Sequence, residues 1–159
     1  MTIYVRPSIM RIAVLDNDRS QADLICQVLT AAGHSCQSYD SGKEMLAHLR
    51  KDSTDMLILD WQVADMSAVD VVRRTREKMP AHMPIMFMTS SSGEDDIVAG
   101  IGAGASDYLI KPLRRGELLA RARAEETIAC ALLSRGDLQP IERATLFLVA
   151  DKVVRTAIL

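Results

Sequence analysis

Short apolar runs alternate with longer amphipathic segments along most of this chain. The apolar runs predict five strands, at Arg11–Leu15, Ser35–Tyr39, Met56–Leu59, Pro84–Met88 and Asp107–Ile110. The segment after the first strand has an apolar stripe that ends at Gly33, and it predicts a helix. A Ser41–Glu44 capping box begins a second helix that runs to Leu49. The stretches Ser67–Lys78, Gly93–Gly104 and Arg114–Ser134 predict three more. This alternation predicts an α/β fold with a doubly wound parallel sheet and helices on both faces.

Polar side chains follow four of the predicted strands, at the point where each apolar run ends. They are Asp16, Asp60, Thr89 and Lys111. Ligands of doubly wound sheets bind at the carboxyl ends of the strands, so we expect these four side chains to lie at one edge. Each alone has a plainer explanation, such as Asp16 capping the next helix or Lys111 being a solvated charge. Four such strand ends together favour a functional site.

The residue types at this edge suit phosphoryl transfer to an aspartate. A carboxylate can accept a phosphoryl group and form a mixed anhydride. Mg²⁺ stabilises the charge that spreads over the transferred oxygens, and it prefers oxygen ligands such as carboxylates. A lysine adds a flexible positive charge. The pattern therefore predicts a site that binds a divalent cation and accepts a phosphoryl group on an aspartate.

Composition and charge narrow the class of protein. The chain has 159 residues, 48% of them hydrophobic and 25% charged, which is typical of one globular domain of ordinary size. Its net charge of −2 provides no general attraction for nucleic acid. No apolar run approaches the ~20 residues of a membrane span, and the N-terminus has no signal-peptide core. We expect a cytoplasmic protein without membrane partners. No glycine-rich nucleotide loop is present, which disfavours a free-standing flavodoxin-like enzyme.

Several motifs together resemble the CheY-like receiver domain of two-component response regulators. They are the acidic turn after the first strand, Leu59-Asp60-Trp61, Met88-Thr89-Ser90, Gly102–Tyr108 (GAGASDY) and Ile110-Lys111-Pro112. The resemblance covers about Met10–Glu125 and implies the strand order 2-1-3-4-5. It also implies a phosphorelay role in signal transduction, with a sensor histidine kinase as partner. Such a protein is a phosphoacceptor and not an enzyme, beyond slow self-dephosphorylation.

The resemblance implies a role for each residue at the predicted site. Asp60 would be the phosphoacceptor, and Mg²⁺ would be held by Asp16, Asn17, Asp60 and the backbone carbonyl of Gln62. Thr89 would hydrogen-bond the arriving phosphoryl group, and Lys111 would pair with Asp60 or its phosphate. Tyr108 would be the switch residue whose rotamer follows Thr89.

Three residues depart from the family pattern beside the metal site. Asn17 stands where a second acidic residue is usual, Ala64 where proline is usual, and Ala68 where glycine is usual. Asn17 keeps an oxygen but loses a charge worth about 4 kcal/mol per unit pair at 4 Å and a dielectric of 20, so we expect Mg²⁺ affinity to be at least roughly ten-fold weaker. Two interpretations stay open, a phosphorylated receiver and a pseudo-receiver that acts as a phosphorylation-independent interaction or dimerisation module.

The last predicted helix of the receiver region resembles the OmpR-type subfamily. That resemblance implies a homodimer through the fourth helix, fifth strand and fifth helix, with Asp107, Glu117 and Arg121 at charged positions of the face. Ile97 departs from it, because a basic residue is usual there.

We expect an N-terminal extension at residues 1–9, a receiver domain at 10–125 and a C-terminal extension at 126–159. The extension would continue the long helix and then form two short strands at Thr145–Ala150 and Val153–Leu159, with an amphipathic helix as the alternative. It is too short to supply a DNA recognition helix, so we expect no specific DNA binding by this chain alone.

Overall fold

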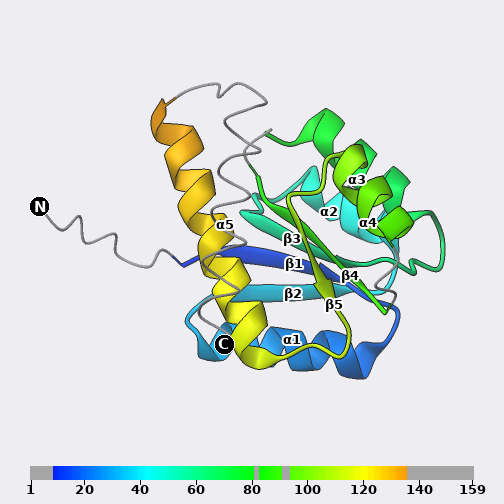
Figure 1. Cartoon of the computed structure of the whole chain (residues 1–159), viewed down its shortest axis with the longest axis horizontal. Coiled ribbons are helices and arrows are strands. Elements are labelled where there is room, and N and C mark those ends of the chain that lie inside the picture. The colour runs from blue at the N-terminus through cyan, green and yellow to red at the C-terminus, as the bar shows by residue number, and fades with distance from the viewer. Residues whose placement is uncertain (1–8, 81–82, 91–93, 136–159) are drawn as a thin grey trace, which may run out of the picture.

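Five parallel strands form one sheet in the order β2-β1-β3-β4-β5. The computed structural model describes residues 9–80, 83–90 and 94–135, the last range with side chains to residue 129. The strands are β1 (Arg11–Leu15), β2 (Ser35–Tyr39), β3 (Met56–Asp60), β4 (Ile85–Thr89) and β5 (Asp107–Ile110). Every neighbouring pair in the sheet is parallel. The predicted fold class, strand order and strand positions are confirmed (Figure 1).

Five helices alternate with these strands, and the first three begin at capping residues. They are α1 (Arg19–Ala31), α2 (Gly42–Leu49), α3 (Ala68–Lys78), α4 (Glu94–Ala103) and α5 (Arg115–Arg135). The side chains of Asp18, Ser41 and Ser67 each accept a hydrogen bond from a backbone N–H in the first turn of the helix that follows. Gly33 follows α1 with a φ of +98°, a conformation that glycine adopts without steric cost.

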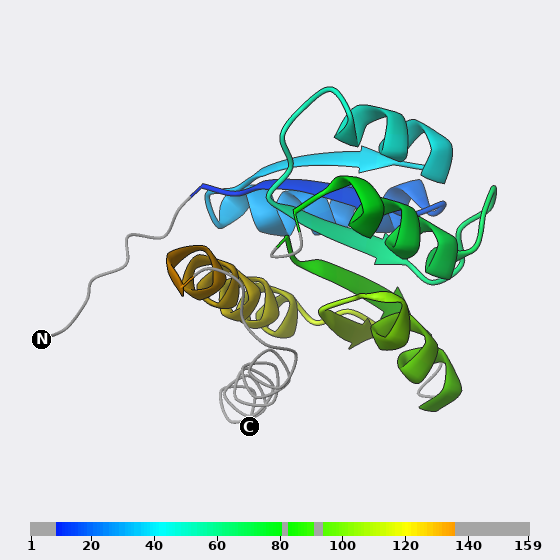
Figure 2. The same cartoon turned by 90° about the horizontal axis from the view of Figure 1, so that it is seen from above.

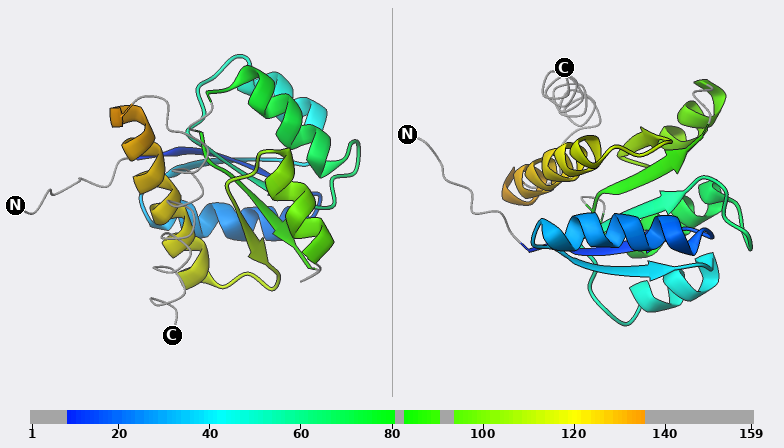
Figure 3. Two further views of the ribbon diagram at one scale, coloured as in Figure 1. Left: turned by 45° about the horizontal axis from the view of Figure 1, so that its top comes forward. Right: turned by 90° about the horizontal axis from the view of Figure 1, so that it is seen from below.

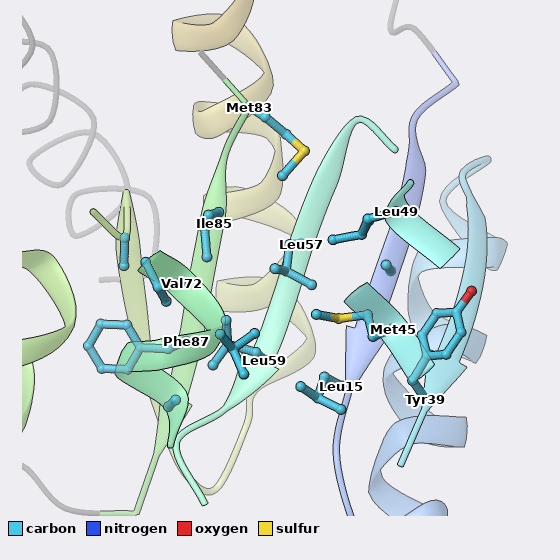
Figure 4. Close-up of a cluster of buried hydrophobic side chains, with 14 residues drawn as sticks. Leu15, Tyr39, Met45, Leu49, Leu57, Leu59, Val72, Met83, Ile85 and Phe87 are labelled. Carbon is cyan, nitrogen blue, oxygen red and sulfur yellow. The ribbon is translucent and has the colours of Figure 1, made fainter. Parts of the chain in front are cut away.

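The sheet separates two cores, one on each face. On one face β-strand residues such as Leu57, Leu59 and Phe87 pack against α2 and α3 (Figure 4). On the other face Val14 and Ile58 pack with residues of α1 and α5. Both β3 and β4 are buried along their whole length, as the continuous apolar runs predict for central parallel strands. Figures 2 and 3 show the helices on both sides of the sheet.

The predictions for the chain termini lie outside the described residues. This applies to most of the extension at residues 1–9, to the short strands at 145–150 and 153–159, and to their alternative helix. The proposed boundary after residue 125 lies within α5, which is continuous to Arg135, so the domain limits stay a prediction. Among the described residues, no helix is long and apolar enough to cross a membrane.

Candidate functional site

The four predicted strand-end side chains meet at the carboxyl edge of the sheet. Asp16 follows β1, Asp60 ends β3, Thr89 ends β4 and Lys111 follows β5. Backbone hydrogen bonds connect the ends of β3, β4 and β5, since Trp61 N–H donates to the Met88 carbonyl and Lys111 N–H donates to the Thr89 carbonyl. The parallel register therefore brings residues from four separate parts of the chain to one place.

Asp60 and Lys111 form the charged centre of this edge. The Lys111 Nζ atom lies 3.1 Å from Asp60 Oδ1, and both side chains are largely withdrawn from solvent. Thr89, on the strand between them, is only 2% exposed. The lysine thus neutralises a carboxylate that burial would otherwise penalise, and a hydroxyl donor lies at the neighbouring strand end.

Asp16 carries a buried oxygen that has no hydrogen-bond partner among the described residues. Its Oδ1 accepts a hydrogen bond from the Asp18 N–H, whereas its Oδ2 accepts none. Burial raises the pKa of Asp16, and the neighbouring Asp60 carboxylate raises it further. A buried, unpartnered carboxylate oxygen beside a second carboxylate is chemically suited to a cation or a proton.

Asn17 and Gln62, both predicted as metal ligands, are hydrogen-bonded to each other. Asn17 Nδ2 donates to the backbone carbonyl of Gln62 at 2.8 Å. Asn17 Oδ1 accepts from the Ala64 N–H at 3.3 Å. The side chain therefore joins the turn after β1 to the loop between β3 and α3, with both ends of its amide in use.

A second set of hydrogen bonds holds the same loop from the opposite side. The Asp65 carboxylate accepts from the backbone N–H of Gly42 at 2.8 Å, from that of Lys43 at 3.0 Å and from the Ser41 hydroxyl. These donors, the Gly42 N–H first, lower the pKa of Asp65. Asp65 thereby caps α2 from a distant loop. The sequence analysis missed this residue, because a cap supplied from 23 positions away leaves no local signal.

Aromatic rings connect the site to α5. The Trp61 ring packs on Phe87 with centroids 5.1 Å apart, and Phe87 lies 6.0 Å from the ring of Tyr108. The Arg121 guanidinium lies 6.0 Å from the Tyr108 ring centroid. Tyr108, the predicted switch residue, is thus in contact with a residue next to Asp60 through one intervening ring.

The charged residues predicted for a dimer face interact within this single chain. Arg121 Nη1 lies 3.0 Å from Asp107 Oδ2, and both side chains are almost fully buried. Arg121 Nε lies 3.2 Å from Glu117 Oε1, one helical turn earlier. The nearby Glu125 is also buried, and burial raises its pKa to about 8. These contacts lie within one chain, so the role of the three charged residues in a dimer stays a prediction.

The predicted Mg²⁺ ligands fit a cation in part. Asp16 and Asp60 supply two carboxylates, one of them with an unpartnered oxygen. The other two predicted ligand oxygens each already accept one hydrogen bond, the Gln62 carbonyl from Asn17 Nδ2 and Asn17 Oδ1 from the Ala64 N–H. No cluster of three or more His, Cys, Asp or Glu side chains suited to a metal occurs in the described ranges. Two carboxylates therefore fit Mg²⁺, and Asn17 stands where the family usually has a third.

Comparison with known proteins shows the family. Residues 12–123 match the family described as the response regulator receiver domain. This chain belongs to the response regulator receiver family. The receiver is 31% identical over 141 residues to the phosphate regulon transcriptional regulatory protein PhoB of Rhizobium meliloti. It is 33% identical over 132 residues to the DNA-binding response regulator MtrA of Mycobacterium tuberculosis.

The matched regions differ in how much of each relative they cover. They cover 85% of this chain and 62% of PhoB, and 83% of this chain and 54% of MtrA. The chain therefore spans little more than half the length of these relatives.

Solved structures show the same fold. A putative response regulator from Chloroflexus aurantiacus is 29% identical, with a TM-score of 0.70 over 77% of this chain and 99% of its own. The chemotaxis response regulator CheY4 of Vibrio cholerae matches with a TM-score of 0.70 at 23% identity, over 74% of this chain and 99% of its own. The CheY-like fold is thus independently supported.

Proposed function

We propose that this receiver accepts a phosphoryl group on Asp60 from a sensor histidine kinase. The observation that carries the proposal is the pairing of Lys111 Nζ with Asp60 Oδ1 at 3.1 Å, beside buried Thr89 and Asp16. The family match makes a phosphoryl donor of the histidine kinase class the expected partner.

The residues of this edge would divide the work of phosphoryl transfer. An Asp60 carboxylate oxygen attacks phosphorus, and the bond from phosphorus to the donor's leaving atom breaks with its electron pair going to that atom. Lys111 would move from the carboxylate to an oxygen of the new phosphate, since its Nζ already lies at the reacting group. Thr89 would donate its hydroxyl to another phosphate oxygen. Mg²⁺ held by Asp16 and Asp60 would neutralise charge that develops on the transferred oxygens.

The response would pass from Thr89 toward Tyr108 and α5. Tyr108 packs on Phe87, which in turn packs on Trp61, so a shift beside Asp60 reaches the Tyr108 ring through packed side chains. The surface that changes would be formed by α4, β5 and α5. Relationship to PhoB and MtrA supports an OmpR-type homodimer through this surface, with charged residues Asp107, Glu117 and Arg121.

Phosphorylation of the purified protein tests this proposal. Incubation with a small-molecule phosphoryl donor at millimolar Mg²⁺ should add the mass of one phosphoryl group, in acid-labile form. The matched control Asp60→Asn removes the acceptor carboxylate with little change in shape and should gain none. A wild-type protein that gains no mass at high Mg²⁺ would contradict the proposal.

A second candidate function is a pseudo-receiver whose partner contacts do not depend on phosphate. The hydrogen bond from Asn17 to the Gln62 carbonyl favours it, because this bond joins the turn after β1 to the loop between β3 and α3 without a metal. This candidate predicts that the phosphate mimic beryllofluoride leaves Trp61 fluorescence unchanged, and that Asp60→Asn assembles as the wild type does. A fluorescence change that requires Asp60 rules it out.

A further inference from the structure

Asn17 uses both halves of its amide to join two segments of the site. Its Nδ2 donates to the Gln62 carbonyl and its Oδ1 accepts from the Ala64 N–H, so a single side chain bridges positions 45 and 47 residues away. The two partners are of opposite kinds, a carbonyl and an N–H, and only one orientation of the amide satisfies both.

An aspartate at position 17 could form only one of these bonds. An ionised carboxylate has no hydrogen to donate, so it would face the Gln62 carbonyl oxygen with a negative oxygen of its own. A cation between the two oxygens would relieve that repulsion. Asparagine needs no cation there, because its own NH₂ group donates a hydrogen bond to the Gln62 carbonyl. The residue that departs from the family pattern thus makes the one contact that the usual residue cannot make.

The loop that Asn17 holds has no proline to restrict it at position 64. Asp65 fastens its far end to the first turn of α2. Between Asp60 and Asp65, the Asn17 side chain bonds the backbone at Gln62 and Ala64, and the Asp60 carboxylate accepts a hydrogen bond from the Gln62 N–H. Asn17 therefore holds two backbone groups of this short stretch, at positions whose own side chains are exposed.

We propose that Asn17 is a clasp that replaces the cation at Gln62. It holds the β3–α3 loop in place without metal, and a divalent cation gains the Gln62 carbonyl only by displacing the Asn17 amide. The statement about the cation rests on the proposed function, whereas the statement about the loop stands independently of it.

Backbone amide exchange at Ala64 tests the loop part of the proposal in metal-free protein. Asn17→Ala removes both hydrogen bonds and adds no charge, so the Ala64 N–H should exchange roughly five-fold faster, the effect of one net hydrogen bond. The matched control Gln62→Ala removes an exposed side chain but keeps the carbonyl, and should leave the exchange unchanged. Amides of β1 and β3 report whether either variant disturbs the fold. Equal Ala64 exchange in wild type and Asn17→Ala would overturn the clasp.

Titration with Mg²⁺ alone, followed by calorimetry, tests the cation part. If the clasp competes with the cation, Asn17→Ala frees the Gln62 carbonyl and binds Mg²⁺ more tightly than the wild type, whereas equal affinity overturns the competition. If the Asn17 oxygen is instead a metal ligand, the alanine variant binds more weakly, and this result overturns the competition. Absence of binding by both proteins would overturn the cation part together with Mg²⁺-dependent phosphorylation, whereas the exchange comparison judges the loop clasp by itself.

Discussion

The two sides of Asp60 are built in different ways. On one side, which we call the reader side, Lys111 pairs with Asp60 and Thr89 lies at the neighbouring strand end. Farther from Asp60 on this side, Phe87 and Arg121 each pack against Tyr108. On the other, which we call the cation side, Asp16 is hydrogen-bonded within the turn after β1, and Asn17 joins that turn to the β3–α3 loop through two exposed hydrogen bonds. A buried ion pair and packed rings stabilise the reader side, whereas hydrogen bonds of the Asn17 amide and of the Asp16 and Asp65 carboxylates hold the cation side.

This difference shows at which positions residues of the family pattern can be replaced without loss of the fold. The reader side shares its residues with the core, so a substitution there disturbs packing as well as signalling. The cation side lies in a turn and a loop, where a new residue can form new hydrogen bonds at the surface. The three departures from the receiver pattern, Asn17, Ala64 and Ala68, lie on or beside the cation side, whereas Ile97, which departs from the OmpR-type pattern, lies in α4.

The largest effect should come from breaking the buried ion pair on the reader side. Arg121→Met leaves Asp107 buried without its guanidinium, and we expect the free energy of unfolding to fall by about 3–5 kcal/mol. Arg115→Met, at an exposed position of the same helix, is the control and should change it by less than about 0.5 kcal/mol. Urea denaturation measures both. Equal stability of the two variants would show that the pair does not support the reader side.

Two glycines of α4 provide a matched pair for the packing of the reader side. A methyl group at Gly100 would lie 2.6 Å from Phe87 Cζ, whereas one at Gly102 would meet no atom within 4 Å. We expect Gly100→Ala to lower the free energy of unfolding by about 1–3 kcal/mol through overpacking. Gly102→Ala should raise it by about 0.5–1 kcal/mol, since alanine favours helix. Thermal denaturation separates the two, and a shift of the same sign in both would argue against close packing of α4 on Phe87.

The anchor of the cation-side loop should have a smaller, pH-dependent effect. Asp65→Ala removes a helix cap, and we expect a loss of about 1 kcal/mol at neutral pH. The pKa of Asp65 lies below its ordinary value of 3.8, so its stabilisation is complete above that value and is lost as the pH falls through the lowered pKa. Denaturation curves of wild type and variant should therefore converge in acid. The exposed Asp40→Ala serves as control, and a difference that persists at low pH would refute the charged cap.

The strand ends were predictable because periodicity and parallel topology are enough to place them. Asp16, Asp60, Thr89 and Lys111 each end an apolar run, and the carboxyl ends of such runs share one edge. The i,i+4 spacing of Glu117 and Arg121 permits the ion pair within α5, although the resemblance had assigned both residues to a dimer face.

The contacts of the cation side were not predictable in the same way. The predicted parallel sheet places Asn17 near Gln62 but does not say which way the Asn17 amide points. The direction of its hydrogen bonds decides whether Asn17 is a metal ligand or a clasp. Asp65 capping α2 depends on a loop path that no local pattern encodes. Hydrogen bonds between distant loops depend on the assembled backbone.

The most direct test of this account is the Mg²⁺ affinity of the wild type and of Asn17→Asp, followed through the fluorescence of Trp61 beside Asp60. A carboxylate at position 17 cannot donate to Gln62 and adds a charge to the cation site. We therefore predict that the variant binds Mg²⁺ at least roughly ten-fold more tightly than the wild type. Equal affinities would contradict the assignment of Asn17 to the cation side and, with it, the contrast between the two sides of Asp60.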